Sequence, residues 1–174
     1  MRAPDPQRTV LERVRRARRQ RLFAAETTTA CAMATREIET VLPHREPMRL
    51  VDRVRGLDLE RGRAWGEHRV LADDRGFDGH FVDRPVYPGV LQLEAAGQLA
   101  LIAAAIGRGL TAPAPVRLTR VLEAAFIDEV GPNTMLTLLC ERVADDGYVL
   151  TSIGQVLDGD RIVCTCALEA MWID

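Results

Sequence analysis

The segment from Gly89 to Ile106, GVLQLEAAGQLALIAAAI, constrains the fold more than any other part of this 174-residue chain. Its polar residues are Gln92, Glu94 and Gln98. Pro88 suits the first turn of a helix, and glycines follow the segment where a helix would end. A helix that is apolar on nearly every face has to be buried on nearly every face. Because the segment is too short for a bilayer and polar residues interrupt it, we expect no membrane span and predict that protein wraps this helix.

The segments on both sides of this helix have the pattern of strands. After the helix, strands are expected over residues 116–128, 134–144, 148–157 and 161–172. The pairs Asp146-Gly147 and Asp158-Gly159 are strong hairpin signals between the last three. Before the helix, we expect a short helix at 37–42, strands at 48–59 and 63–70, and a long loop at 72–88. The predicted fold class is α+β, one antiparallel sheet curled around one helix.

Charge divides the chain into a basic tail and an acidic body. All 23 basic residues are arginine; eight arginines against two acids give residues 1–22 a net charge of +6, and the rest carries −8. We expect residues 1–35 to be a tail and 36–174 to be one domain. The tail is interpreted as a disordered solvated arm. The alternatives are an extension upstream of a start at Met33, a binding arm for an acidic partner or nucleic acid, and a targeting peptide. Residues 7–23 can also form a short basic helix with Val10, Val14 and Ala17 on one side.

The cysteines and histidines predict no metal site. Four cysteines form neither a CxxC pair nor a disulfide framework, so we expect reduced thiols in a cytoplasmic protein. Cys164 and Cys166 fall on one face of a strand with other apolar residues and are read as apolar filler. His44 and His68 are expected to be structural or surface residues, and the three histidines have no zinc spacing with the cysteines. His80 differs, because it lies in the middle of the long loop.

His80 is part of a motif with fixed spacing. Gly79-His80-Phe81 is followed by Pro85, Pro88-Gly89 and Glu94, which reads G-H-F-x3-P-x2-P-G-x4-E. This motif resembles the signature of the 3-hydroxyacyl-ACP dehydratases of FabZ type and, more weakly, of FabA type. The segments 42–54 (LPHREPMRLVDRV) and 120–138 are similar to other parts of the same family. The resemblance covers about residues 36–172.

The resemblance implies a fold, an assembly and a set of roles. The fold would be the hot dog fold, in which a curved antiparallel sheet wraps a long helix. The protein would form homodimers, in some relatives trimers of dimers, with His80 of one chain facing Glu94 of the other. The substrate would arrive on an acyl carrier protein, and no cofactor is implied.

The implied reaction is loss of water from a 3-hydroxyacyl thioester to give the trans-2-enoyl form. His80 would be the base at C2, and Glu94 the proton donor to the leaving oxygen, provided that burial keeps it protonated. The backbone N–H of Gly89, at the positive end of the helix, would stabilise the thioester oxygen. The carbonyl of Val86 would orient the imidazole, and Gln98 would lie beside Glu94. The setting is either fatty-acid synthesis or a polyketide or polyene pathway.

One departure from the family pattern and two alternative functions accompany this interpretation. Val82-Asp83 stands where the FabZ pattern usually has Pro-Gly, and Asp83 is a possible partner for His80. The same fold also serves CoA-thioester hydratases and thioesterases, and non-catalytic partner subunits of dehydratases. Retention of both His80 and Glu94 favours an enzyme, and nucleic-acid binding would rest on the tail alone.

Overall fold

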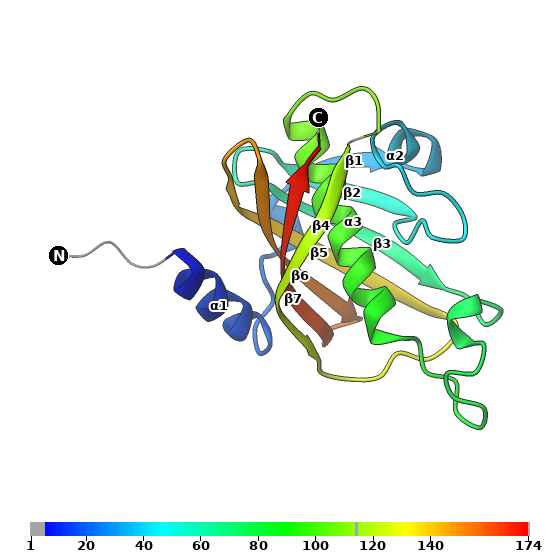
Figure 1. Cartoon of the computed structure of the whole chain (residues 1–174). Coiled ribbons are helices and arrows are strands. Elements are labelled where there is room, and N and C mark those ends of the chain that lie inside the picture. Colours follow the sequence, from blue (N-terminus) through cyan, green and yellow to red (C-terminus); the bar gives the residue numbers. More distant parts are fainter. Residues whose placement is uncertain (1–5, 114, 174) are drawn as a thin grey trace.

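Helix α3 (Gly89–Gly107) lies in the hollow of one curved antiparallel sheet of seven strands (Figure 1). The structure is a computed structural model, and it describes residues 6–113 and 115–173. The strand order is β1-β2-β3-β5-β6-β7-β4, which leaves β1 and β4 at the edges. This arrangement confirms the predicted α+β architecture of a long helix wrapped by a sheet. The strands are β1 (Thr29–Met33), β2 (Arg53–Asp58), β3 (Arg63–Val70), β4 (Val116–Phe126), β5 (Thr134–Asp145), β6 (Val149–Asp158) and β7 (Arg161–Trp172).

Burial of α3 follows from its composition. Eleven of its 19 residues are buried, and the core they share with the sheet includes Leu99, Ile102, Leu138 and Val156. The expectation that this helix is too short for a bilayer is wrong, because its length and composition would suffice to cross a membrane. The protein buries 61% of the apolar stretch, as expected for the core helix of a wrapped fold.

The hairpins form where the Asp-Gly pairs predicted them. Gly147 (φ 96°) and Gly159 (φ 60°) occupy the left-handed conformation that lets β5, β6 and β7 turn back on one another. The strand expected from residue 48 begins later, at Arg53, because the backbone N–H of Leu50 donates to the side chain of Gln98. The cysteines Cys31, Cys140, Cys164 and Cys166 are free thiols, and all but Cys31 are buried.

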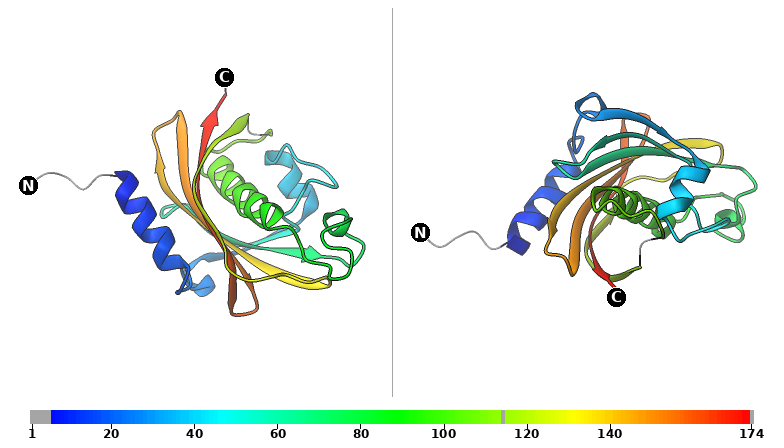
Figure 2. Two further views of the ribbon diagram at one scale, coloured as in Figure 1. Left: turned by 60° about the horizontal axis from the view of Figure 1, so that its bottom comes forward. Right: turned by 90° about the horizontal axis from the view of Figure 1, so that it is seen from above.

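The N-terminal segment differs from the expected solvated arm. Residues 6–17 form helix α1 (Pro6–Ala17), which lies on the outer face of the sheet, opposite α3 (Figure 2). Val10, Val14 and Ala17 are buried, and the two valines pack against Ile153 of β6 and Ala167 of β7. Burial of the apolar face of α1 therefore stabilises this segment more than full solvation would, while the arginines occupy the other face.

Acidic residues of the body hold this basic helix. Arg15 and Arg18 pair with Glu123 of β4, and Arg13 pairs with Glu141 of β5 at 2.5 Å.

After a 3-10 turn, η1 (Ala25–Thr27), strand β1 pairs antiparallel with β2, although the sequence predicts a linker for this stretch. The boundary at residues 35 and 36 stays a prediction. The short helix expected at 37–42 is α2 (Thr35–Val41), and the long loop contains one 3-10 turn, η2 (Arg75–Phe77).

Candidate active site

The loop before α3 holds the ring of His80 in one orientation. Gly79 has φ 79°, a backbone conformation that other residues rarely adopt, and His80 follows it. The Nδ1 atom of His80 lies 2.8 Å from the carbonyl oxygen of Val86. A carbonyl can only accept a hydrogen bond, so we assign the proton to Nδ1, and the lone pair of Nε2 remains free. The partner of the ring is thus Val86 rather than Asp83, and the ring stacks on Phe81 at 4.3 Å.

Tyr87 fastens this loop to the core. Its side chain is completely buried, and its backbone N–H donates to the carbonyl of Val130 at 2.7 Å. Its hydroxyl lies 3.0 Å from Nε2 of His68, a buried residue of β3. Burial, together with the charges of Asp74 and Asp52, raises the pKa of Tyr87, so the hydroxyl stays protonated. The Val86 carbonyl is therefore positioned by a buried neighbour.

Gly89 begins α3 beside this loop. A Cβ atom at this position would lie 2.5 Å from Cδ1 of Phe126, so a glycine allows the ring to pack against the start of the helix. His80, Val86 and Gly89 line one open hollow together with Phe126 and Asp128. The positive end of the helix dipole and a free imidazole nitrogen thus face the same space.

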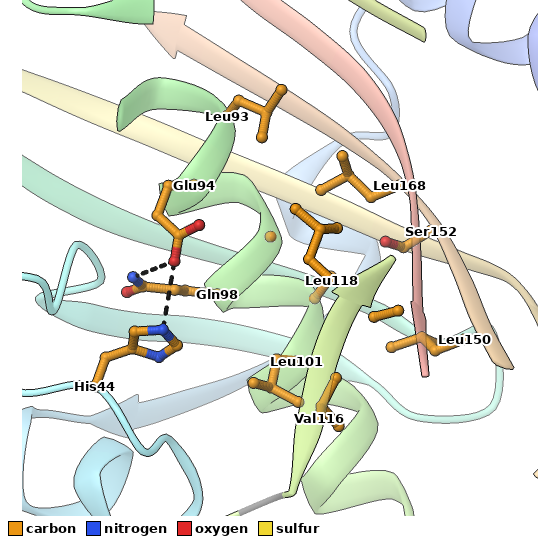
Figure 3. Close-up of a pocket in the computed structure, with 13 residues that line it drawn as sticks. His44, Leu93, Glu94, Gln98, Leu101, Val116, Leu118, Leu150, Ser152 and Leu168 are labelled. Atoms are coloured by element: carbon orange, nitrogen blue, oxygen red, sulfur yellow. Dashed lines mark hydrogen bonds and ion pairs between the residues drawn. The ribbon is translucent and has the colours of Figure 1, made fainter. Parts of the chain in front are cut away.

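Glu94 lies one and a half turns further along α3, in a different pocket. Its Oε1 atom accepts a hydrogen bond from Nε2 of Gln98 at 2.9 Å and lies 3.5 Å from Nε2 of His44 (Figure 3). The Glu94 side chain is 29% exposed, so it is less buried in the single chain than the apolar helix led us to expect. Apart from Ser152, the rest of this pocket is apolar, with walls from α3, β4, β6 and β7. Its apolar lining consists of Leu93, Gly97, Ala100, Leu101, Val116, Leu118, Leu150, Leu168 and Ala170.

The five predicted site residues thus form two groups within one chain. His80, Val86 and Gly89 lie together in the open hollow, and Glu94 and Gln98 lie together in the apolar pocket. Sequence reasoning missed His44 and Tyr87 as neighbours of these groups. His44 is in the LPHREP segment that carries part of the family resemblance, which was the available signal. Tyr87 stands between Val86 and Pro88, within the motif.

Comparison with known proteins identifies the family of this chain. The model of the FabA-like domain matches residues 42–166. The chain belongs to the FabA-like family. FabA-like relatives include a protein named 3-hydroxyacyl-[acyl-carrier-protein] dehydratase FabZ from Novosphingobium aromaticivorans, 35% identical over 140 residues, which cover 80% of this chain and 88% of the relative. A protein of the same name from Xanthomonas oryzae pv. oryzae is 39% identical over 140 residues, with 76% and 92% covered.

Solved structures support the fold of this FabA-like protein. The dehydratase heterocomplex ApeI:P from Xenorhabdus doucetiae aligns with a TM-score of 0.68 and 14% identity, covering 79% of this chain and 91% of that one. A hypothetical thioesterase with coenzyme A from Streptococcus pneumoniae aligns with a TM-score of 0.54 and 11% identity, covering 69% and 84%. At these identities the likeness establishes the hot dog fold and no more.

Proposed function

We propose that this protein is a hydro-lyase that converts 3-hydroxyacyl-ACP thioesters to trans-2-enoyl-ACP. The observation that carries the proposal is the His80 imidazole, fixed through Nδ1 by the Val86 carbonyl and free at Nε2, beside the amino end of α3. The names and 35–39% identities of the FabZ relatives support the same reaction.

The roles of the residues follow from the bonds that change. Nε2 of His80 takes the proton from C2, and the electron pair of the C–H bond moves toward the thioester carbonyl. The N–H of Gly89 stabilises the negative charge on the carbonyl oxygen. Glu94, in its protonated form, gives a proton to the hydroxyl on C3, whose bond to carbon breaks as water leaves. His80 has then gained one proton, Glu94 has lost one, and C2 and C3 share a double bond.

The apolar pocket beside Glu94 suits the acyl chain of such a substrate. A chain of methylene groups gains free energy by leaving water, about 0.8 kcal/mol for each CH₂ that is buried. Leucines and alanines of α3 and the sheet line the pocket, with Ser152 as a polar exception. Glu94 lies at its polar end (Figure 3).

A homodimer would bring the two groups of residues together. Edge strand β4 leaves Leu118 46% and Val121 49% exposed, and Phe126 at its end is 53% exposed. These apolar side chains lie beside both the His80 hollow and the Glu94 pocket, since Phe126 lines one and Leu118 the other. A second copy seated on this edge would cover them and place His80 of one chain near Glu94 of its partner.

The names of the relatives place the reaction on an acyl carrier protein, and we assign it to fatty-acid synthesis in the cytoplasm. The free thiols of all four cysteines fit a reducing compartment. A polyketide or polyene pathway is the alternative setting that a comparison of chain-length preferences would test. The higher assembly, dimer or trimer of dimers, is a question for mass measurement in solution.

The test follows the absorbance of the enoyl thioester with a short 3-hydroxyacyl-ACP. His80→Ala and Glu94→Gln should each lower the rate by about 10²–10⁴, the usual contribution of a general acid or base. Asp83→Asn is the control, because Asp83 lies in the same loop but His80 pairs with Val86 instead. Wild-type rates in both site variants would refute the assigned roles, and an inactive wild-type protein would refute the function.

A further inference from the structure

We propose that His44 is a positioning residue for Glu94: together with Gln98 it determines which carboxyl oxygen of Glu94 carries the proton that is given to the substrate. The inference rests on the proposed function. It starts from the pocket, where Gln98 and His44 approach the same oxygen of Glu94, and within residues 6–113 and 115–173 no such contact is made to the other oxygen (Figure 3).

The orientation of the Gln98 amide is settled by its other two partners. Its Oε1 atom accepts from the backbone N–H of Leu50 at 2.8 Å, and its Nε2 atom donates to the carbonyl of Met48 at 2.7 Å. A backbone N–H can only donate and a carbonyl can only accept, so the amide cannot be turned over. Nε2 therefore faces Glu94 as a donor, and Oε1 of Glu94 is the acceptor.

The orientation of the His44 ring points to a second donor. Nε2 lies 3.5 Å from Oε1 of Glu94, while Nδ1 is buried without a hydrogen-bond partner among the described residues. A proton on Nδ1 alone would leave a buried donor unpaired and would turn the Nε2 lone pair toward the lone pairs of Glu94. The neutral ring with its proton on Nε2 avoids both penalties. Contacts of this length in an empty site commonly shorten when substrate binds.

Two donors on one oxygen make the carboxyl group asymmetric. A protonated carboxyl group has one oxygen that only accepts and one that donates. Because Oε1 faces the N–H groups of Gln98 and His44, a proton on Oε1 would oppose both of them. The proton therefore resides on Oε2, and Oε2 is the oxygen left to serve the C3 hydroxyl.

Arg45 holds the backbone of His44 in place. Its guanidinium donates to the carbonyls of Leu42 at 2.7 Å and of His44 at 2.9 Å. Arg45 therefore supports the same loop, and the contacts of its guanidinium in the described part of the chain are to Leu42, His44 and Glu39 rather than to Glu94. Arg45→Ala is therefore the matched control, because it loosens the loop but keeps the imidazole of His44.

The first experiment reads the tautomer of His44 without reference to activity. Long-range ¹H–¹⁵N correlation spectra of the uniformly labelled protein, assigned with His44→Gln, distinguish a proton on Nε2 from one on Nδ1. We expect the Nε2–H form at pH 7.5 in the wild type and in Arg45→Ala. An Nδ1–H tautomer or a doubly protonated ring would overturn the proposal, even if the wild-type protein turned out to have no dehydratase activity.

The second experiment compares kcat and KM for His44→Ala and His44→Gln. We expect His44→Ala to lower kcat about tenfold with little change in KM, the size of effect that loss of one hydrogen bond gives. Glutamine can present a neutral N–H in place of the imidazole, so His44→Gln should recover most of the loss. A merely structural role predicts equal losses in both variants, in proportion to the fraction unfolded; that result, or full activity in His44→Ala, would refute the proposal.

Discussion

The Nδ1 atom of His80 and the carbonyl oxygen of Val86 are 2.8 Å apart, so a backbone group of the same loop fixes the ring that we propose as the base. Five residues lie between the two in sequence, and the loop is closed around them by a hydrogen bond from the Val86 N–H to the His80 carbonyl at 2.9 Å. Because the loop closes on itself, Nε2 of His80, the nitrogen that we propose as the base, is oriented before any substrate arrives.

Tyr87→Phe should destabilise the protein and weaken the support of the His80 loop. The change leaves Nε2 of the buried His68 without its partner, which costs about 1–3 kcal/mol in free energy of unfolding. Urea unfolding measures this loss. Tyr148→Phe is the matched control, because Tyr148 is 75% exposed and should unfold like the wild type. Equal stability of the two variants would show that the hydroxyl contact contributes nothing.

Val14→Ala should destabilise the whole fold although it lies in the basic N-terminal segment. Val14 is completely buried between α1 and the outer face of the sheet, and loss of its two methyl groups costs about 1–3 kcal/mol. The control is Val82→Ala, since Val82 is 87% exposed. A solvated arm would predict no change in the unfolding midpoint for either variant.

The central helix and the strands after it could be predicted because each depends on a local pattern. The apolar run of α3 has to be buried, and the Asp-Gly pairs determine where the hairpins turn. The packing of α1 could not be predicted in this way. It depends on Gln155, a buried side chain of β6 that donates to the carbonyl of Gln20 and accepts from the N–H of Leu22. These partners lie more than 130 residues away in sequence.

The residues of the candidate site differ in the same way in how far the sequence predicts them. The spacing of the motif indicated His80, Gly89 and Glu94 because the family fixes those positions. The neighbours of Glu94 depend on how residues 42–50 return to α3, which the Gln98 amide decides through Met48 and Leu50. A histidine in a loop carries no local sign of that contact, so the sequence predicts only a surface or structural role for His44.

Asp52→Asn should destabilise the protein at neutral pH and not in strong acid. Burial alone would raise the pKa of Asp52, but hydrogen bonding to His68 and to the N–H of Arg69, with the charge of Arg49, outweighs burial and lowers it. The N–H of Arg69 is 2.6 Å from Oδ2, and Nδ1 of His68 is 3.4 Å away. A carboxyl group with a lowered pKa in the folded state stabilises it above the unfolded pKa, which is about 3.9, and this stability is lost as the pH falls through the folded value.

The expected loss in Asp52→Asn is about 1 kcal/mol at pH 7, because the carboxylate is partly exposed and partly screened. The difference from wild type should shrink as the pH falls below about 4 and vanish once both states of the wild type are protonated. Urea unfolding at several pH values measures it, with the exposed Asp73→Asn as control. A difference that stayed constant with pH would mean that shape rather than charge is responsible.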